Sequence, residues 1–260
     1  VAGAVRGFAA ELGAAPVVKA ARGGYDGRGV VVATTVDEAV AAATRWRADG
    51  VAVVLEAPVR FSAELAALLV RRASGDVVSW PAVETAQLDG VCREVRVPGG
   101  VSAATARAAA ALATQVAQQI DAVGVLAVEL FETDEGLLVN EVALRPHNSG
   151  HWTIEGATTS QFENHLRAVL DLPLGATDLA APAICTVNVF GGTGHGSFDL
   201  DAALSDPGAK VHLYGKAPRP GRKLGHVTVL GTDATETAER AWRAAAALGT
   251  PRPVDIGASR

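Results

Sequence analysis

Apolar residues along this chain of 260 residues occur in two patterns, short continuous or alternating runs and longer stretches with helical spacing. The short runs predict strands at residues 16–20, 30–33, 51–56, 77–83, 91–97, 125–133, 137–144, 183–190, 211–214 and 226–230. The helical spacing predicts helices at residues 1–12, 35–49, 102–121, 160–172 and 234–248, with Thr35, Ser102 and Ser160 as their caps where a cap is visible. Residues 62–73 fit both patterns, because their composition favours a helix and the flanking turns also allow a long strand.

The two strands that flank Asp134-Glu135-Gly136 form a predicted hairpin. A three-residue loop with glycine in the left-handed position pairs Thr133 with Leu137 and places Glu129 opposite Glu141. The two carboxylates then project from one face, with Cβ atoms about 4.5–5.5 Å apart. Because facing like charges destabilise a sheet, this register predicts a divalent cation between them, and oxygen ligands favour magnesium. A two-residue loop would instead shift the register and direct the two carboxylates to opposite faces.

A glycine-rich loop, Arg22-Gly23-Gly24-Tyr25-Asp26-Gly27-Arg28-Gly29, separates the strands expected at 16–20 and 30–33. The backbone N–H groups of such a loop can close over a polyanion. It is not a Walker loop, because it lacks Gly-Lys-Ser/Thr and no helix follows it. Glycine content alone equally allows a mobile surface turn. Lys19 beside the loop and Arg28 within it favour phosphate binding.

Two further polar segments have the composition of a site. The run Arg145-Pro146-His147-Asn148-Ser149-Gly150-His151-Trp152 directly follows the predicted hairpin. We expect His151 and Trp152 to serve as scaffold, and His212 to be an ordinary strand residue. The second segment, residues 216–223, contains four cations, two prolines and a glycine. It is either a solvated loop or a preformed anion site, and its rigid turn residues support the anion site.

Composition excludes several classes of protein. The chain is 49% hydrophobic and 20% charged, which is ordinary for a globular protein, and its net charge of −5 gives no indication of nucleic-acid binding. The two cysteines, Cys92 and Cys185, lie far apart, so we expect reduced cytoplasmic thiols rather than a disulfide framework. No apolar run approaches the ~18 residues of a membrane span, and no signal peptide is visible.

Four motifs, in this order along the chain, carry a resemblance to a known family. They are RGGYDGRG at residues 22–29, RPHNSGHWT at 145–153, TSQFE at 159–163 and RPGRKLGH at 219–226. Together they resemble the 5-(carboxyamino)imidazole ribonucleotide synthetases, a family of ATP-grasp ligases in purine biosynthesis. The resemblance extends over nearly the whole chain, and the second and fourth motifs are its most specific parts.

The resemblance implies a fold and a domain organisation. The fold is the ATP-grasp fold, of the α+β (α/β) class, with ATP between two antiparallel-sheet subdomains. An ATP-grasp domain is expected over residues 1–180 and a small C-terminal domain, which binds the substrate's phosphate, over residues 181–260. The resemblance favours a strand at 62–70, against the composition. Family members carry an N-terminal Rossmann-like domain; because the sequence contains no methionine and opens directly in a helical pattern, we expect this domain to be absent.

The implied reaction is the ATP- and bicarbonate-dependent carboxylation of the amine of 5-aminoimidazole ribonucleotide through carboxyphosphate. ATP and Mg²⁺ are the implied cofactors, and bicarbonate and the ribonucleotide are the implied partners, without nucleic acid or membrane. The resemblance also implies a cytoplasmic homodimer.

The family's functional residues can be carried over by motif. Nucleotide binding is implied for Lys19, Gly24, Tyr25, Asp26, Gly27, Arg28, Gly29, Val30, Glu56, Ala57, Pro58, Val59, Glu64, Gln87, Asn140 and Glu141. Magnesium binding is implied for Glu129 and Glu141. Catalytic roles are implied for Arg145, His147 and Asn148, which would face bicarbonate and carboxyphosphate, and for Asp26, which would meet the amine. Binding of the substrate's phosphate is implied for Lys216, Arg219, Arg222 and Lys223.

Two alternative functions stay open. The first is another ATP-grasp ligase, such as a formate-using glycinamide ribonucleotide transformylase or a biotin carboxylase, against which the motif at 219–226 argues. The second is an ATP-binding fragment without turnover, because the family's N-terminal domain helps to close the ribonucleotide site. The substrates that the reaction requires distinguish the first alternative from the carboxylating synthetase. Turnover by this chain would exclude the second alternative.

Overall fold

The computed structural model describes residues 1–23, 29–192, 198–254 and 256. The chain forms two compact units. The N-terminal unit comprises residues 1–60 and 88–91, and the large unit comprises residues 61–87 and 92–260. No helix formed by the described residues is both long and apolar enough to cross a membrane.

The N-terminal unit is a small antiparallel sheet with two helices. Its elements are α1 (Ala2–Leu12), β1 (Val17–Ala20), β2 (Val30–Val32), α2 (Val36–Ala48) and β3 (Val53–Glu56). The sheet has the order β2-β1-β3, so β1 and β2 form the hairpin predicted on either side of the glycine-rich loop. Thr35 caps α2, since its side chain accepts a hydrogen bond from the backbone of Glu38 at 3.2 Å. The buried residues of both helices and of β1 form one apolar core.

The large unit contains the remaining elements. Its strands are β4 (Ala63–Arg71), β5 (Val77–Ser79), β6 (Val83–Leu88), β7 (Val91–Val97), β8 (Gly124–Thr133), β9 (Gly136–Ala143), β10 (Ala183–Phe190), β11 (Ala209–Leu213) and β12 (Lys223–Gly231). Its helices are α3 (Ala103–Gln119), the 3₁₀ turn η1 (Asn148–Gly150), α4 (Thr153–Gly156), α5 (Gln161–Val169), α6 (Leu200–Ala203) and α7 (Ala234–Ala247). The short elements η1, α4 and α6 have no counterpart in the sequence prediction.

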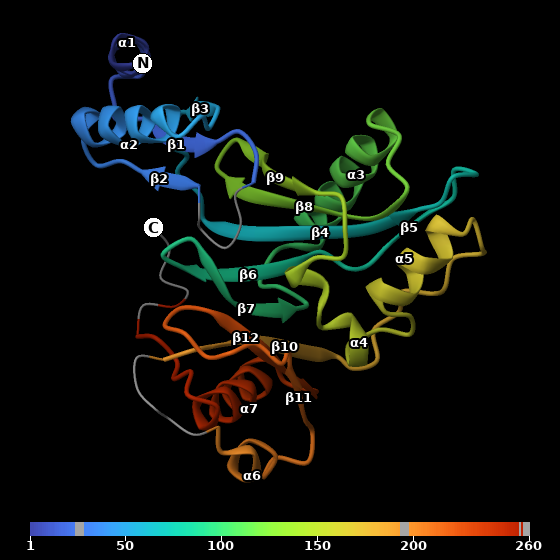
Figure 1. Ribbon diagram of the computed structural model, residues 1–260. Helices are drawn as coiled ribbons and strands as arrows, with labels where there is room; N and C mark the ends of the chain where they lie inside the picture. The colour runs from blue at the N-terminus through green and yellow to red at the C-terminus, as the bar shows by residue number, and fades with distance from the viewer. Residues whose placement is uncertain (24–28, 193–197, 255, 257–260) are drawn as a thin grey trace. The chain divides into compact units, whose positions relative to one another are not determined.

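One antiparallel sheet organises the large unit. Among the described residues nine strands join it, in the order β11-β12-β10-β7-β6-β4-β8-β9, with β5 paired to β4 (Figure 1). Strands β9 and β11 are therefore its two edges. Helix α3 packs on one face of β4 and β8, whereas Trp152 and Ala168, from the segment around α4 and α5, pack on the other. Helix α7 covers the C-terminal strands β10 and β12.

Residues 62–73, which fitted two patterns, include strand β4. The helix favoured by composition is wrong here, and the strand implied by the resemblance is confirmed. Residues 65–70 are all buried, and β4 lies between β6 and β8. A central strand covered on both faces has apolar residues at every position, so the alternation that usually marks a strand is absent. Tertiary packing thus overrides the helical propensity of its alanines and leucines.

Candidate functional site

The β8–β9 hairpin carries the two carboxylates predicted to hold a cation, and its turn differs from the prediction. Thr133 pairs with Gly136, so the loop has two residues rather than the expected three. A bulge nevertheless shifts the register between Glu129 and Leu130, with Asn140 as the additional residue on β9. Glu129 therefore lies opposite Glu141, as predicted, although the predicted loop is wrong. The bulge compensates for the short loop, because one extra residue restores the side-chain parity of the strand.

The facing pair lies at the border of the large unit's core. The Glu129 side chain is 22% exposed, and Glu141 is exposed on the edge strand β9. Among the described residues, no group of three or more His, Cys, Asp or Glu side chains is arranged to hold a metal ion. Two carboxylates can supply part of a magnesium shell, since this ion is usually held by one or two carboxylates, water and substrate phosphates. The chemistry of the pair fits that ion.

His147 lies beside the acidic pair. Its Nε2 is 3.6 Å from Oε1 of Glu129, and its side chain is 11% exposed. On the other side of the ring, Nδ1 lies 2.9 Å from Oγ of Ser149. The neighbouring Arg145 is exposed, and its Nη1 donates a hydrogen bond to the carbonyl of Pro146 at 3.1 Å. This part of the predicted site therefore presents a cation, an imidazole and a carboxylate from adjacent positions.

Asn148 connects the same segment to the predicted phosphate site. Its Oδ1 accepts a hydrogen bond from Nζ of Lys223 at 3.1 Å. Lys223 is the first residue of β12, whereas Glu129 lies on β8, and four strands separate β12 from β8 in the sheet. His147 and Asn148 are consecutive residues, so this segment links a residue of β8 to a residue of β12. The structure thus brings four of the predicted residues, Glu129, His147, Asn148 and Lys223, into one row.

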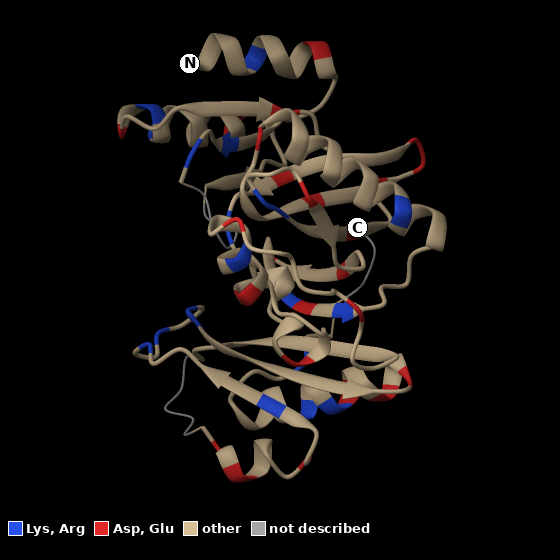
Figure 2. Cartoon of the chain, turned by 90° about the vertical axis from the view of Figure 1, so that its right-hand side faces the viewer, with Lys and Arg blue, Asp and Glu red and all other residues tan. Residues whose placement is uncertain are grey.

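The loop between β11 and β12 presents the other predicted cations (Figure 2). Backbone hydrogen bonds fix it to the end of β10: Gly191 donates to Arg222 at 2.8 Å and accepts from Gly221 at 2.9 Å. A Cβ at Gly191 would lie 2.2 Å from the carbonyl oxygen of Arg219, so only glycine fits there. Lys216 is exposed, with Nζ 5.4 Å from the centre of the Tyr214 ring. Such backbone fixation is what a preformed anion site requires.

Three stacked imidazoles lie next to this row. His226 stacks on His212 with centroids 4.5 Å apart and on His151 at 5.0 Å. Tyr214 Oη lies 2.7 Å from Nδ1 of His226, and Nε2 of His212 lies 2.6 Å from a carboxylate oxygen of Glu155. Burial lowers the pKa of His226 to about 2 and that of His151 to about 4 from the usual 6.5, so both rings are neutral near pH 7. The stack joins β11 and β12 to the turn that contains His147 and Asn148.

The N-terminal unit places some of the predicted nucleotide residues. Lys19 pairs with Val30 across β1 and β2, and its Nζ lies 2.7 Å from Oε2 of Glu56 on β3. Gly29 has a φ of 86° and its carbonyl accepts a hydrogen bond from Ala20 at 2.7 Å. Residues Ala57, Pro58 and Val59 directly follow β3. Gly24, Tyr25, Asp26, Gly27 and Arg28 lie outside the described residues.

The other predicted nucleotide residues belong to the large unit. Glu64 lies on β4, where it pairs with Thr85 of β6 and with Phe131 of β8. Gln87 lies near the end of β6, and Asn140 is the bulge residue of β9. Glu64, Gln87 and Asn140 are half-buried.

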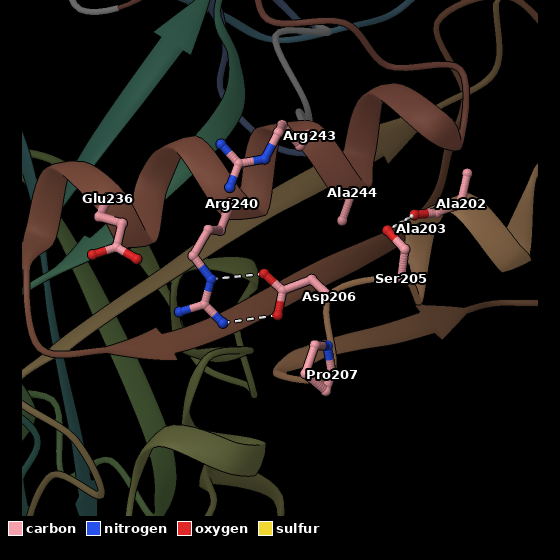
Figure 3. A pocket seen from close by; sticks show the side chains of 9 residues that line it. All are labelled: Ala202, Ala203, Ser205, Asp206, Pro207, Glu236, Arg240, Arg243 and Ala244. Carbon is pink, nitrogen blue, oxygen red and sulfur yellow. Dashed lines mark hydrogen bonds and ion pairs between the residues drawn. The ribbon is translucent and has the colours of Figure 1, made fainter.

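A hollow of about 510 Å³ lies elsewhere, between α6 and α7 (Figure 3). Asp206 accepts hydrogen bonds from Nε and Nη2 of Arg240 at 2.6 and 2.8 Å. This bidentate pair lowers the pKa of Asp206 to about 2 from 3.8. The hollow's lining, which also includes Glu236 and Arg243, contains none of the residues predicted as site residues. The ion pair joins the turn after α6 to α7, and the hollow lies outside the predicted site.

Two protein-family models match this chain. Residues 2–162 match the ATP-grasp domain, and residues 185–240 match the phosphoribosylaminoimidazole carboxylase C-terminal domain. The N5-carboxyaminoimidazole ribonucleotide synthase of Mycobacterium tuberculosis (strain H37Rv) is 51% identical over 255 residues, which cover 95% of this chain and 59% of that protein. The chain belongs to the ATP-grasp family of N5-carboxyaminoimidazole ribonucleotide synthases.

Solved structures of this synthase family have the same fold. The enzyme of Thermus thermophilus superimposes with a TM-score of 0.79 at 39% identity, over 95% of this chain and 65% of that one. The Aspergillus clavatus enzyme in complex with ADP and 5-aminoimidazole ribonucleotide gives a TM-score of 0.84 at 32% identity, over 96% of this chain and 66% of that one. The chain thus spans 59% of the length of its Mycobacterium relative.

Several residues that contact the predicted site were not identified from the sequence. One of them is Gln161, which contacts His147. The others form or contact the imidazole stack: His212, His226 and Tyr214. His212 is not the ordinary strand residue that we expected, since its ring is stacked and bonded to Glu155. Gln161 occurs in the TSQFE motif, where the prediction used only the cap formed by Ser160. Periodicity is the sequence signal that could have identified these residues, because a polar residue at a position that packs inward suggests a buried hydrogen bond.

Proposed function

We propose that this chain carries out, in purine biosynthesis, the ATP- and bicarbonate-dependent carboxylation of 5-aminoimidazole ribonucleotide. A bicarbonate oxygen attacks the γ-phosphorus of ATP, the bond to the β-phosphate oxygen breaks, and ADP and carboxyphosphate form. The exocyclic amine then attacks the carboxyl carbon, phosphate leaves, and the nitrogen loses a proton. The observation that carries the proposal is the segment His147-Asn148, which contacts Glu129 on one side and Lys223 on the other.

The proposed catalytic residues act by position and charge. Phosphoryl transfer leaves little covalent chemistry for the protein, so preorganised charges supply most of the acceleration. The exposed guanidinium of Arg145 would neutralise bicarbonate and carboxyphosphate. The ring of His147 and the amide of Asn148 would orient these anions. Asp26 would accept a hydrogen bond from the attacking amine.

We assign the anion of the ribonucleotide to Lys216, Arg219, Arg222 and Lys223. The hydrogen bonds that fix this loop to Gly191 support the assignment, since a rigid site loses little conformational entropy when it binds phosphate. Lys223 would share its ammonium between Asn148 and the phosphate, so the proposal couples ribonucleotide binding to the catalytic segment.

We assign Mg²⁺ to Glu129 and Glu141, with Asn140 beside them. The facing register and the oxygen-only donor set support this. The ion, when bound, neutralises charge on the phosphates. ATP itself is assigned to Lys19, the residues from Gly24 to Val30, the residues from Glu56 to Val59, Glu64 and Gln87. Some of these belong to the N-terminal unit and others to the large unit.

The functional division of the chain remains part of the proposal. We assign residues 1–180 to the ATP-grasp domain and residues 181–260 to substrate-phosphate binding. The two matched families, at 2–162 and 185–240, support a division near this position. The continuous sheet from β9 to β11 means that the two parts share one framework.

A homodimer in the cytoplasm completes the proposal. Large apolar side chains exposed on and after α5 support an oligomer, with Leu166 at 60% and Leu170 at 67%. Among the described residues Cys92 and Cys185 form no disulfide, which supports a reducing compartment. Light scattering of the purified chain tests the dimer; a monomeric mass at micromolar concentration would contradict it.

The decisive experiment measures ADP formation by this chain. We expect it to require bicarbonate, 5-aminoimidazole ribonucleotide and Mg²⁺ together. Formation of ADP with glycinamide ribonucleotide and formate would instead indicate the transformylase. ATP binding without ADP formation under any of these conditions would indicate a fragment that binds nucleotide and does not turn over.

A further inference from the structure

Gln161 forms hydrogen bonds with both backbone groups of His147. Its side chain is completely buried. Oε1 accepts a hydrogen bond from the backbone N–H of His147 at 2.8 Å, and Nε2 donates one to the carbonyl of the same residue at 2.8 Å. His147 is extended, with φ −122° and ψ 155°. One side-chain amide thus satisfies both backbone groups of His147, as a neighbouring strand would do in a sheet.

The same amide also orients His151. Nε2 of Gln161 lies 3.1 Å from Nδ1 of His151. An amide nitrogen only donates, so Nδ1 accepts, and a neutral His151 carries its proton on Nε2. His151 in turn stacks on His226 of β12. Gln161 therefore lies where the catalytic segment and the imidazole stack meet.

Packing leaves this amide a single position. The backbone N–H of Gln161 donates to Oγ1 of Thr153 at 2.9 Å, and Thr153 donates to the carbonyl of Gly150 at 2.6 Å. A Cβ on Gly150 would lie 2.5 Å from Oε1 of Gln161 and 2.7 Å from Leu68. The turn formed by residues 147–153 is thus closed around the glutamine.

We propose that Gln161 is a positioning residue of this site, whose amide fixes the backbone of His147 and so directs His147 toward Glu129 and Asn148 toward Lys223. This inference rests on the proposed function and deepens it. Gln161 itself contacts no substrate in this scheme. Its effect is large because an error of about 1 Å in a catalytic group can lower a rate by about 100-fold.

The kinetic test compares Gln161→Met with Gln115→Met in ADP formation. Methionine keeps the length of glutamine and removes every hydrogen bond to His147 and His151. We expect kcat to fall about 10–100-fold, with KM for ATP within about twofold of the wild type. Gln115 is exposed on α3, so its variant serves as the matched control and should behave as the wild type. An unchanged kcat, or an equal loss in kcat and in ATP affinity, would overturn the proposal.

A second variant and a spectroscopic measurement cover the case of poor folding. Gln161→Asn keeps an amide but is one methylene shorter, so it cannot reach both backbone groups of His147, and kcat should fall. In ¹⁵N–¹H spectra at fixed pH, the amide of His147 and the ring signals of His147 and His151 should shift in both Gln161 variants. Unmoved signals would overturn the proposal.

A double substitution separates this proposal from the proposed function. Glu129→Gln should shift the ring signals of His147 in the wild-type background, and this response should be at least halved when Gln161→Met is also present. An equal response in both backgrounds would show that Gln161 does not position His147. If the wild-type chain forms no ADP, the proposed function fails, and these spectra alone decide the role of Gln161.

Discussion

The β8–β9 hairpin and the loop between β11 and β12 both present charges to the site, but contacts of different range place them. Glu129 and Glu141 face each other through the register of one hairpin, within a few residues of its turn. The cations of the loop depend on Gly191 at the end of β10, and Lys223 on Asn148, which lies 75 positions away. One region is built by local geometry and the other by tertiary contacts.

This difference explains what holds the site together. The acidic hairpin can form as soon as its two strands pair, since a hairpin needs little loop closure. The basic loop has its final position only when β10, β12 and the segment around Asn148 have assembled. The turn at 147–153 connects the two regions, so damage to that turn should affect both, whereas damage to either region should remain confined to it.

The largest expected effect therefore comes from the connecting turn. Gly150→Ala should lower the free energy of unfolding by about 2–3 kcal/mol, because its Cβ would overlap Gln161 and Leu68 in a fully packed core. Urea denaturation measures this. The matched control is Gly7→Ala in α1, where a Cβ meets nothing within 4 Å. That variant should gain about 0.5–1 kcal/mol, since alanine is the better helix former. Equal effects would mean that the turn is loosely packed.

Removing cations from the basic loop should have a specific effect on one substrate. Lys216→Ala and Arg222→Ala should each raise KM for the ribonucleotide about 10–100-fold, because a charge-assisted hydrogen bond to phosphate contributes about 1.5–3 kcal/mol. KM for ATP should change by less than about twofold. Lys210→Ala removes an exposed cation from β11 and should change neither constant. Parallel increases for both substrates would place the phosphate site elsewhere.

An ion pair that serves packing rather than the site should give a smaller, acid-dependent effect. Arg240 lowers the pKa of Asp206 from 3.8 to about 2, so folding favours the ionised form. This pair contributes about 1–2 kcal/mol above pH 4, and the contribution should disappear as pH falls from 4 to 2. Measured between pH 4 and pH 2, the denaturation midpoint of Asp206→Asn should lack this increment. Turnover near pH 7 should be unchanged in this variant. A loss of turnover would connect this pair to the site.

Much of the fold follows from local sequence. The caps at Thr35, Ser102 and Ser160 all accept the hydrogen bond that the pattern predicts, because capping depends on residues only three positions apart. Strand β10 is found at residues 183–190, as its apolar run predicts. Strand β4 shows the limit, since burial on both faces removes the alternation. Its identity as a strand depends on β6 and β8, which the local pattern does not contain.

The site, like the fold, is predictable where it depends on local sequence and not where it depends on tertiary contacts. The facing of Glu129 and Glu141 follows from hairpin reasoning, yet the two-residue turn and the bulge at Asn140 that produce it do not. Two errors in register cancelled. The contact of Asn148 with Lys223 and the clamp by Gln161 join distant parts of the chain, and no local spacing encodes them.

The most direct test of this account concerns the acidic pair, and it measures ATP affinity as Mg²⁺ is titrated. We expect Glu141→Gln to need about tenfold more Mg²⁺ than the wild type for half-maximal ATP binding, because one of two carboxylate ligands is lost. Glu135→Gln, on the exposed turn of the same hairpin, should match the wild type. Identical Mg²⁺ dependence in all three proteins would contradict the assignment of this pair to the metal.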